Sequence, residues 1–190
     1  MTTNLLARSL CTDVCPAWFA WVINNPLRRW LHKPEEILGR LIAPGSTVVD
    51  LGCGSGPFTI ALAHMVGSSG RVIAADVQPA MLAKVLRRVT RAGLQERVVL
   101  HVCGPNRPGL SDRVDFVLAF WMVHEVANPG LLFEEMHEAL NIEGKLLLVE
   151  PKFHVGRGSF EKEVDAGLSA KLKLIARPSV RLSRAALFAK

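Results

Sequence analysis

The chain has 190 residues, of which 49% are hydrophobic and 21% charged, and its formal net charge is +6. This length accommodates one domain with one sizeable core, and the composition excludes a disordered chain. The basic residues are scattered and do not alternate with aromatic residues, so we expect solvated helix faces and no nucleic-acid surface.

The beginning of the sequence lacks the basic segment, apolar run and small-residue cleavage site of a signal peptide. No apolar stretch reaches the roughly 18 residues of a membrane span. We therefore expect a cytoplasmic protein whose four cysteines (Cys11, Cys15, Cys53 and Cys103) are free thiols. Cys11 and Cys15 have the spacing of half a metal site, but no second His or Cys pair completes it, and no metal is expected.

Residues 1–33 form an N-terminal extension that carries three of the four tryptophans, Trp18, Trp21 and Trp30. Asn24-Asn25-Pro26 interrupts its predicted helical structure. Two interpretations stay open. The aromatic residues pack on the edge of the main domain or on a neighbouring subunit, as in a homodimer, or they form a lid over the substrate.

Residues 34–190 alternate strand and helix patterns, which favours an α/β domain with a parallel sheet and helices on both faces. A first strand ends near residue 49, and four more are expected over 71–76, 97–103, 115–121 and 144–151. Two last strands, 172–182 and 183–190, are joined too tightly for a crossover helix, so they must pair antiparallel. The expected fold is a doubly wound, mostly parallel seven-stranded sheet with a C-terminal antiparallel hairpin. Helices are expected over 34–43, 57–67, 80–93, 131–141 and 160–172.

A glycine-rich loop at residues 48–58 (VVDLGCGSGPF) is the most informative stretch of the chain. Gly52, Gly54 and Gly56 permit positive φ and close approach to a ligand, and Pro57 suits the first turn of a helix. The dinucleotide fingerprint has the different spacing G-x-G-x-x-G. Asp50 would also lie against a diphosphate as a like charge. A ligand that carries an ammonium group and no phosphate therefore fits the loop better.

Four stretches together resemble the class I S-adenosylmethionine-dependent methyltransferases. Residues 50–56 are similar to the family's first motif, D/E-x-G-x-G-x-G, and Asp76 falls where its ribose-binding acid ends the second strand. Residues 115–126 and 144–151 resemble its fourth-strand motif and fifth strand. The resemblance extends over residues 34–190 and is to the small-molecule branch, the type found among ubiquinone and menaquinone biosynthesis methyltransferases. It implies a Rossmann-like methyltransferase fold and S-adenosylmethionine as cofactor.

By this resemblance, Asp50 and the glycine loop would hold the methionine end of the cofactor, and Asp76 would accept hydrogen bonds from both ribose hydroxyls. Residues after the second and third strands would flank the adenine. Many family members carry Asp or Glu near position 104, where this chain has Gly104, so recognition of the adenine amino group is not implied. The expected cofactor-binding residues are Asp50, Gly52, Cys53, Gly54, Gly56, Asp76, Val77, Met81, Cys103, Gly104 and Phe120.

Methyl transfer is an in-line displacement at a sulfonium, for which the protein aligns the nucleophile and excludes water. A base is needed only where the nucleophile must lose a proton. His124 and Glu125 follow the fourth strand and are the candidate catalytic residues, the alternative being that His124 only packs at the strand end. His154 and Lys152 are weaker candidates. The acceptor is expected to be a small, partly hydrophobic molecule.

Three other functions remain open at this stage. A non-catalytic member would bind the cofactor and act as a partner subunit. An arsenite-type methyltransferase would bind arsenic through cysteines, which requires that the N-terminal extension fold over the site. An NAD-binding oxidoreductase is disfavoured by Asp50 and by the terminal hairpin.

Overall fold

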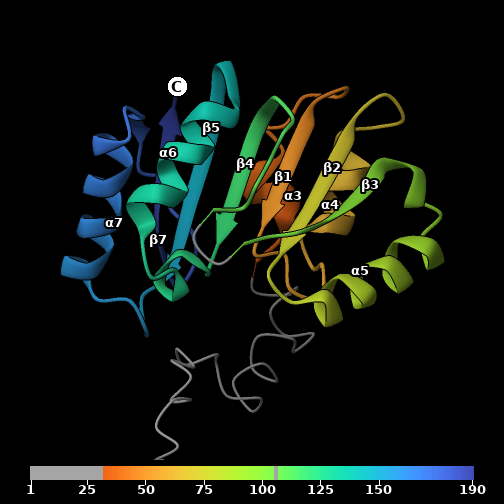
Figure 1. Cartoon of the computed structure of the whole chain (residues 1–190), viewed down its shortest axis with the longest axis horizontal. Coiled ribbons are helices and arrows are strands. Elements are labelled where there is room, and N and C mark those ends of the chain that lie inside the picture. The colour runs from red at the N-terminus through yellow and green to blue at the C-terminus, as the bar shows by residue number, and fades with distance from the viewer. Residues whose placement is uncertain (1–31, 105–106) are drawn as a thin grey trace, which may run out of the picture.

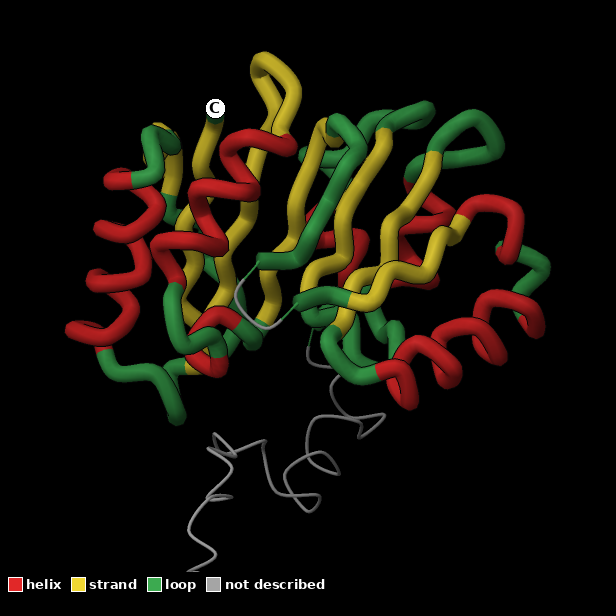
Figure 2. Tube along the Cα trace, viewed as in Figure 1, coloured by secondary structure: helices red, strands yellow, loops and turns green. Residues whose placement is uncertain are grey.

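A computed structural model describes residues 32–104 and 107–190, so the N-terminal extension with its tryptophans lies outside the described residues except for its last two positions. The described part contains one seven-stranded sheet of order β3-β2-β1-β4-β5-β7-β6 (Figures 1 and 2). The strands are β1 (Thr47–Leu51), β2 (Arg71–Asp76), β3 (Val98–Val102), β4 (Val114–Phe120), β5 (Leu140–Pro151), β6 (Lys173–Ala176) and β7 (Ser183–Ala189).

Helices cover both faces of this sheet, as the alternating pattern predicts (Figure 1). The helices are α3 (Pro34–Leu38), α4 (Thr59–Met65), α5 (Pro79–Arg91), α6 (Pro129–Ala139) and α7 (Arg157–Ser169), with short 3₁₀ turns η1 (Gln95–Arg97) and η2 (Val123–Glu125). One hydrophobic core joins the sheet to α3, α4 and α5, and a second joins it to α6 and α7. No helix among the described residues is long and apolar enough to cross a bilayer.

Side-chain alternation along the central strands divides the two cores. In β1, Val48 belongs to the core under α4 and α5, whereas Val49 and Leu51 belong to the core under α6 and α7. Both valines are fully buried, as expected for a parallel strand covered on each face. Asp50 is on the same face as Val48, and its burial therefore requires a polar partner inside the protein.

The antiparallel end of the sheet confirms the predicted terminal hairpin. Strand β7 lies between β5 and β6 and pairs antiparallel with both. Its register with β5 runs from Lys145 opposite Ala189 to Pro151 opposite Ser183. Strands β1 to β5 are paired in parallel with one another. The carboxyl ends of β1, β2 and β4 therefore lie at one edge of the sheet, the lower edge in Figure 1.

Several elements differ from their predicted bounds; β6, for example, covers only Lys173–Ala176 of the strand expected over 172–182. Two further differences have a local cause. The helix expected over 34–43 ends at Leu38, because Gly39 is a poor helix former and the chain turns immediately after it. Strand β5 begins at Leu140, directly after α6, rather than at Gly144. Leu140 pairs with Val114 ahead of an irregularity in the ladder, and Asn141 donates a 2.7 Å hydrogen bond to Asp115 on the neighbouring strand.

Candidate functional site

The glycine loop connects β1 to α4 with three positive φ angles, 64° at Gly52, 54° at Gly54 and 79° at Gly56. A Cβ atom built on Gly54 would meet no atom within 4 Å, so this part of the loop presents bare backbone to an open side. A Cβ atom on Gly52 would lie 2.8 Å from Met122 Cβ and Cγ. Gly52 is therefore required for the contact between the loop and the segment that follows β4.

Asp76, at the end of β2, is bonded to the glycine loop. One carboxylate oxygen accepts the N–H of Gly54 and the other accepts the N–H of Gln78, each at 2.8 Å. The residue is 7% exposed. Because a carboxylate has about four acceptor positions, these two bonds leave capacity for the hydroxyls of a bound ribose. Asp76 thus fixes the loop, a role that the sequence did not indicate.

Asp50, in β1 just before the glycine loop, is bonded to the helix that follows the loop. Its carboxylate accepts a 2.5 Å hydrogen bond from Thr59 Oγ1 in the first turn of α4, and the residue is 3% exposed. A second contact holds the loop from the other side, where Arg88 of α5 donates to the carbonyl of Ser55 at 2.7 Å. The loop is therefore held by side chains from β1, β2, α4 and α5 before any ligand binds.

Apolar side chains flank this site beyond the ends of β2 and β3. Val77 is 53% exposed and Val102 is 57% exposed, and Met81 is half-buried. Cys103 is a half-buried free thiol whose pKa is raised to about 12 by burial and by the charge of Asp76. Gly104, the next residue, is exposed.

Phe120, another of the expected cofactor-binding residues, has a buried ring. It packs against Phe58, with ring centroids 4.4 Å apart, and against His32 and Trp121. Trp121 has a positive φ of 59°, which turns the chain sharply after β4. Its indole N–H donates to Ser183 Oγ at 3.0 Å, and its ring meets the exposed ring of Phe153 edge-on.

His124 lies in η2 and is held by the buried carboxylate of Glu150, at the end of β5. The Nδ1 atom is 2.6 Å from Glu150 Oε2, and Glu150 Oε1 accepts the backbone N–H groups of Val123 and His124. Burial lowers the pKa of His124, but the hydrogen bond and the charge of Glu150 outweigh it, and the net shift is upward. The ring is thereby oriented with Nε2 as the nitrogen remaining for proton exchange.

Glu125, the other predicted catalytic residue, lies next to this pair. Its Oε1 atom is 3.9 Å from His124 Nε2, and its pKa is raised chiefly by burial. The ring of His154 stands 4.9 Å from that of His124. The structure thus brings Glu125 and His154 to His124.

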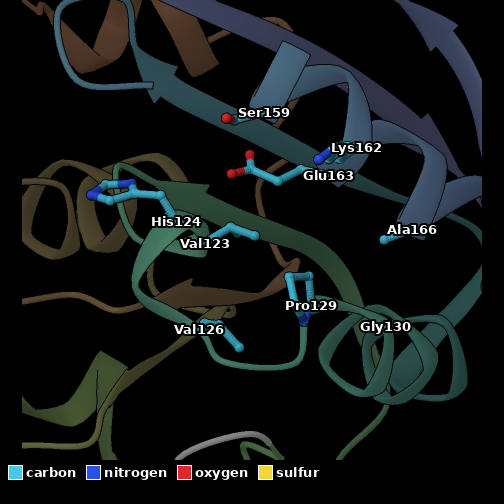
Figure 3. Close-up of a pocket in the computed structure, with 9 residues that line it drawn as sticks. All are labelled: Val123, His124, Val126, Pro129, Gly130, Ser159, Lys162, Glu163 and Ala166. Atoms are coloured by element: carbon cyan, nitrogen blue, oxygen red, sulfur yellow. The ribbon is translucent and has the colours of Figure 1, made fainter. Parts of the chain in front are cut away.

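A cavity of about 350 Å³ lies between η2, α6 and α7 (Figure 3). Its apolar lining includes Val123, Pro129 and Ala166, and its polar lining includes His124 and Glu163. Figure 3 shows the Glu163 carboxylate directed away from α7 toward the segment of Val123 and His124. No glycine of the 52–56 loop lines it.

Glu163 was not identified from the sequence. It is 6% exposed, and its Oε2 atom has no hydrogen-bond partner among the described residues. Burial, followed by the charge of Glu150, raises its pKa to about 8. A signal was available in the sequence, because Phe160, Val164 and Gly167 define the buried face of α7 and Glu163 lies on that same face. Among the described residues, no group of three or more His, Cys, Asp or Glu is arranged to hold a metal ion.

A sheet of order 3-2-1-4-5-7-6 with β7 antiparallel, a glycine loop after β1 and an acid at the end of β2 together define a class I S-adenosylmethionine-dependent methyltransferase. Comparison with known proteins agrees. The profile of the family described as "Methyltransferase domain" matches residues 42–180, and the chain belongs to this family. S-adenosylmethionine is the cofactor of this class, which sets the NAD-binding alternative aside.

Relatives and solved structures support the same class. The chain is 31% identical over 124 residues to the ubiquinone/menaquinone biosynthesis C-methyltransferase UbiE of Hydrogenovibrio crunogenus, covering 65% of this chain and 48% of that protein. It is 26% identical over 123 residues to a demethylmenaquinone methyltransferase of Bacillus velezensis, covering 65% and 52%. A SAM-dependent methyltransferase from Aquifex aeolicus superposes with a TM-score of 0.79 at 26% identity, covering 93% of this chain and 99% of that one. The chain thus spans about half the length of the curated relatives it matches.

The residues at the lower edge of the sheet fit this cofactor. The open face beside Gly54 leaves room for the methionine portion, and Asp76 retains acceptor capacity for ribose hydroxyls. The exposed apolar side chains of Val77 and Val102 offer a surface that suits an adenine ring.

Proposed function

We propose that the chain transfers a methyl group from S-adenosylmethionine to a small, partly hydrophobic acceptor of the quinone or hydroquinone kind. The match of the methyltransferase domain family over residues 42–180 is the observation that carries the proposal. The names of the two curated relatives support the acceptor class. So do the aromatic rings of Trp121 and Phe153, which lie beside each other just after β4 and β5.

In the proposed mechanism, the chain's residues bind, orient and exchange a proton. When bound, S-adenosylmethionine supplies an electrophilic methyl group on a sulfonium. Asp76 would hold the ribose hydroxyls, and the 52–56 loop would hold the methionine portion. The adenine would be flanked by Val77, Met81, Cys103 and Gly104. The role of Asp50 would be indirect, through the loop that it holds with Thr59.

His124 would act as the general base in this mechanism. A hydroquinone becomes a stronger carbon nucleophile when it loses a hydroxyl proton, and His124 Nε2 is the position that can receive it. Glu150 would stabilise the resulting imidazolium and fix the ring, because its carboxylate is fully buried and 2.6 Å from Nδ1. Glu125 would be a second carboxyl group near Nε2 rather than the base itself.

We further propose residues 1–33 as a lid on the acceptor. Residues 1–31 lie outside the described residues, so the proposal depends on the tryptophans of this segment and on the need to exclude water during methyl transfer. A homodimer using the same segment is the competing proposal, and no membrane or nucleic-acid partner is proposed.

Two alternatives are less well supported. Arsenic binding requires thiolates, and burial raises the pKa values of both Cys53 and Cys103. A cofactor-binding partner subunit without activity has no use for the buried carboxylate that orients His124.

The experiment measures binding first and turnover second. Calorimetry with S-adenosylhomocysteine and with NAD tests the cofactor, and tighter binding of NAD would contradict the proposal. Release of S-adenosylhomocysteine is then followed with reduced demethylmenaquinone and with catechol as acceptors. His124→Gln keeps cofactor binding and loses turnover if His124 is the base. Cofactor binding without turnover on any hydroquinone would favour the subunit alternative.

A further inference from the structure

The cavity between η2, α6 and α7 is separate from the cofactor loop and has its own unexplained polar group. Its volume of about 350 Å³ is at the lower end of the range for small-molecule sites, roughly 300 to 1,000 Å³. A single water molecule accounts for about 30 Å³ of liquid volume. The cavity is therefore too large for one bridging water.

The unexplained group is the carboxyl of Glu163. A buried oxygen without a hydrogen bond is unfavourable, and native proteins contain few such atoms. The residue is 6% exposed, lines the cavity and has an unpartnered Oε2. Replacing it by an apolar residue would remove the unfavourable atom, so the carboxyl is costly for folding alone. A ligand that hydrogen-bonds to it would account for its presence.

The charges around Glu163 favour a neutral ligand. Glu150 on β5 is a buried carboxylate that already has His124 of η2 as its partner, so an anion would be repelled from this end. Lys162 of α7 lines the same cavity, which disfavours a cation. Glu125 of η2 is the remaining acid near His124. With its pKa raised to about 8, the Glu163 carboxyl carries its proton at neutral pH and offers both a donor and an acceptor.

We propose that this cavity is a second binding site for a small uncharged molecule that places a ring between Val123, Pro129 and Ala166 and pairs an amide group with the carboxyl of Glu163. An amide matches a protonated carboxyl because each supplies one donor and one acceptor. His124 forms part of the wall, and no residue of the 52–56 loop does. Occupancy of the cavity would therefore change the surroundings of His124 without occupying the cofactor site.

Benzamide is a suitable probe, and the test uses the full chain labelled with ¹⁵N and with ¹³C methyl groups. We expect saturable shifts at the Val123 and Ala166 methyls. Glu163→Leu keeps the side-chain bulk and removes the hydrogen bonds, and it should weaken binding about tenfold or more, as for loss of roughly 1.4 kcal/mol of hydrogen bonding. Glu161→Leu is the matched control, because Glu161 lies on the same helix, pairs with Arg177 and does not line this cavity.

The pH dependence gives a second, independent measurement. Wild-type affinity for benzamide should fall above about pH 8, where the carboxyl loses its proton, and Glu163→Gln should remove this dependence. Benzoate and benzylamine should bind more weakly than benzamide. Equal affinity in the Glu163→Leu variant, shifts confined to Val77 and the glycine loop, or no saturable shift at all would each overturn the proposal.

Discussion

Replacement of Asp76 should lower the stability of the cofactor-free protein as well as its cofactor affinity. From the sequence, this acid is expected to bind ribose alone, and its removal should then leave the apo protein unchanged. In the structure, its two oxygens accept the N–H groups of Gly54 and Gln78 at 2.8 Å. Asp76→Ala removes both bonds, whereas Asp76→Asn keeps one acceptor and turns an amide N–H₂ toward the other N–H.

The magnitude follows from the kind of bond. A hydrogen bond to a charged group contributes about 1.5 to 3 kcal/mol, so two contribute about 3 to 6 kcal/mol. We expect the lower limit, about 3 kcal/mol, because the open side of Gly54 lets water replace the lost acceptor. This is a large part of the about 5 to 15 kcal/mol by which domains are usually stable. With an m-value of about 2 kcal/mol/M, the urea midpoint should fall by about 1.5 M in Asp76→Ala and about half of that in Asp76→Asn.

Urea unfolding followed by circular dichroism measures this change, and calorimetry with S-adenosylhomocysteine measures affinity on the folded fraction. Asp115→Ala is the matched control. Asp115 also accepts two hydrogen bonds, from the Thr47 N–H and from Asn141 Nδ2, but at the opposite edge of the sheet. Both variants should be less stable, and only the Asp76 variants should bind cofactor more weakly. An unfolding curve of Asp76→Ala that superposes on that of the wild type would refute the reasoning.

Three further predictions concern other parts of the chain. The pKa of Glu163 is raised from 4.5 in the unfolded state to about 8 in the folded state. The folded state therefore binds more protons between these pH values, and its stability falls with rising pH by up to about 1.4 kcal/mol per pH unit. Glu163→Gln should flatten this dependence in urea titrations from pH 5 to 8. Gly52→Ala should weaken cofactor binding at least tenfold, because Gly52 has a φ of 64° and an added Cβ would clash with Met122. Adding Met122→Ala to this variant should restore only part of the cofactor affinity. Removal of residues 1–31 should preserve cofactor binding and abolish turnover.

Each of these has a result that would contradict it. Glu161→Gln should keep the wild-type pH dependence, and if Glu163→Gln also keeps it, the buried carboxyl does not carry the shift. Wild-type cofactor affinity in Gly52→Ala would show that the loop moves freely past Met122. Aggregation of the truncated protein would indicate that the tryptophans belong to a core or a subunit interface.

The sheet could be predicted because its signals are local. Apolar runs that end in Asp50 and Asp76 mark the strands at whose ends the site is built, and the tight connection before Ser183 requires an antiparallel pair. The position of β7 between β5 and β6 was not predicted, since no local pattern specifies which strand a neighbour pairs with. The early end of α3 depends on Gly39, and the early start of β5 depends on side-chain pairing with β4. Hydrophobic periodicity does not predict either boundary.

The site was predicted less completely, because its contacts join distant positions. Glu150 lies near the end of the strand predicted over 144–151, but its bond to His124 spans 26 residues and depends on the adjacency of β4 and β5. Asp50 and Asp76 were expected to face the ligand, yet their hydrogen bonds also hold the loop itself. Glu163 lies on the buried face of α7, and a helical pattern defined by apolar residues alone does not identify a carboxyl on that face.

The segment after β4 connects the parts of this site. Trp121 turns the chain through a positive φ, so the residues that follow contact different partners: Met122 lies against Gly52 of the cofactor loop, and His124 lies against Glu150 of β5. Met122 occupies the space that a side chain at position 52 would need, so the loop cannot shift toward β4 without displacing this segment. The position of His124 therefore depends on the glycine loop through two residues of backbone. In the proposed mechanism, a cofactor bound against the loop would therefore also restrain the segment that carries His124, the proposed base.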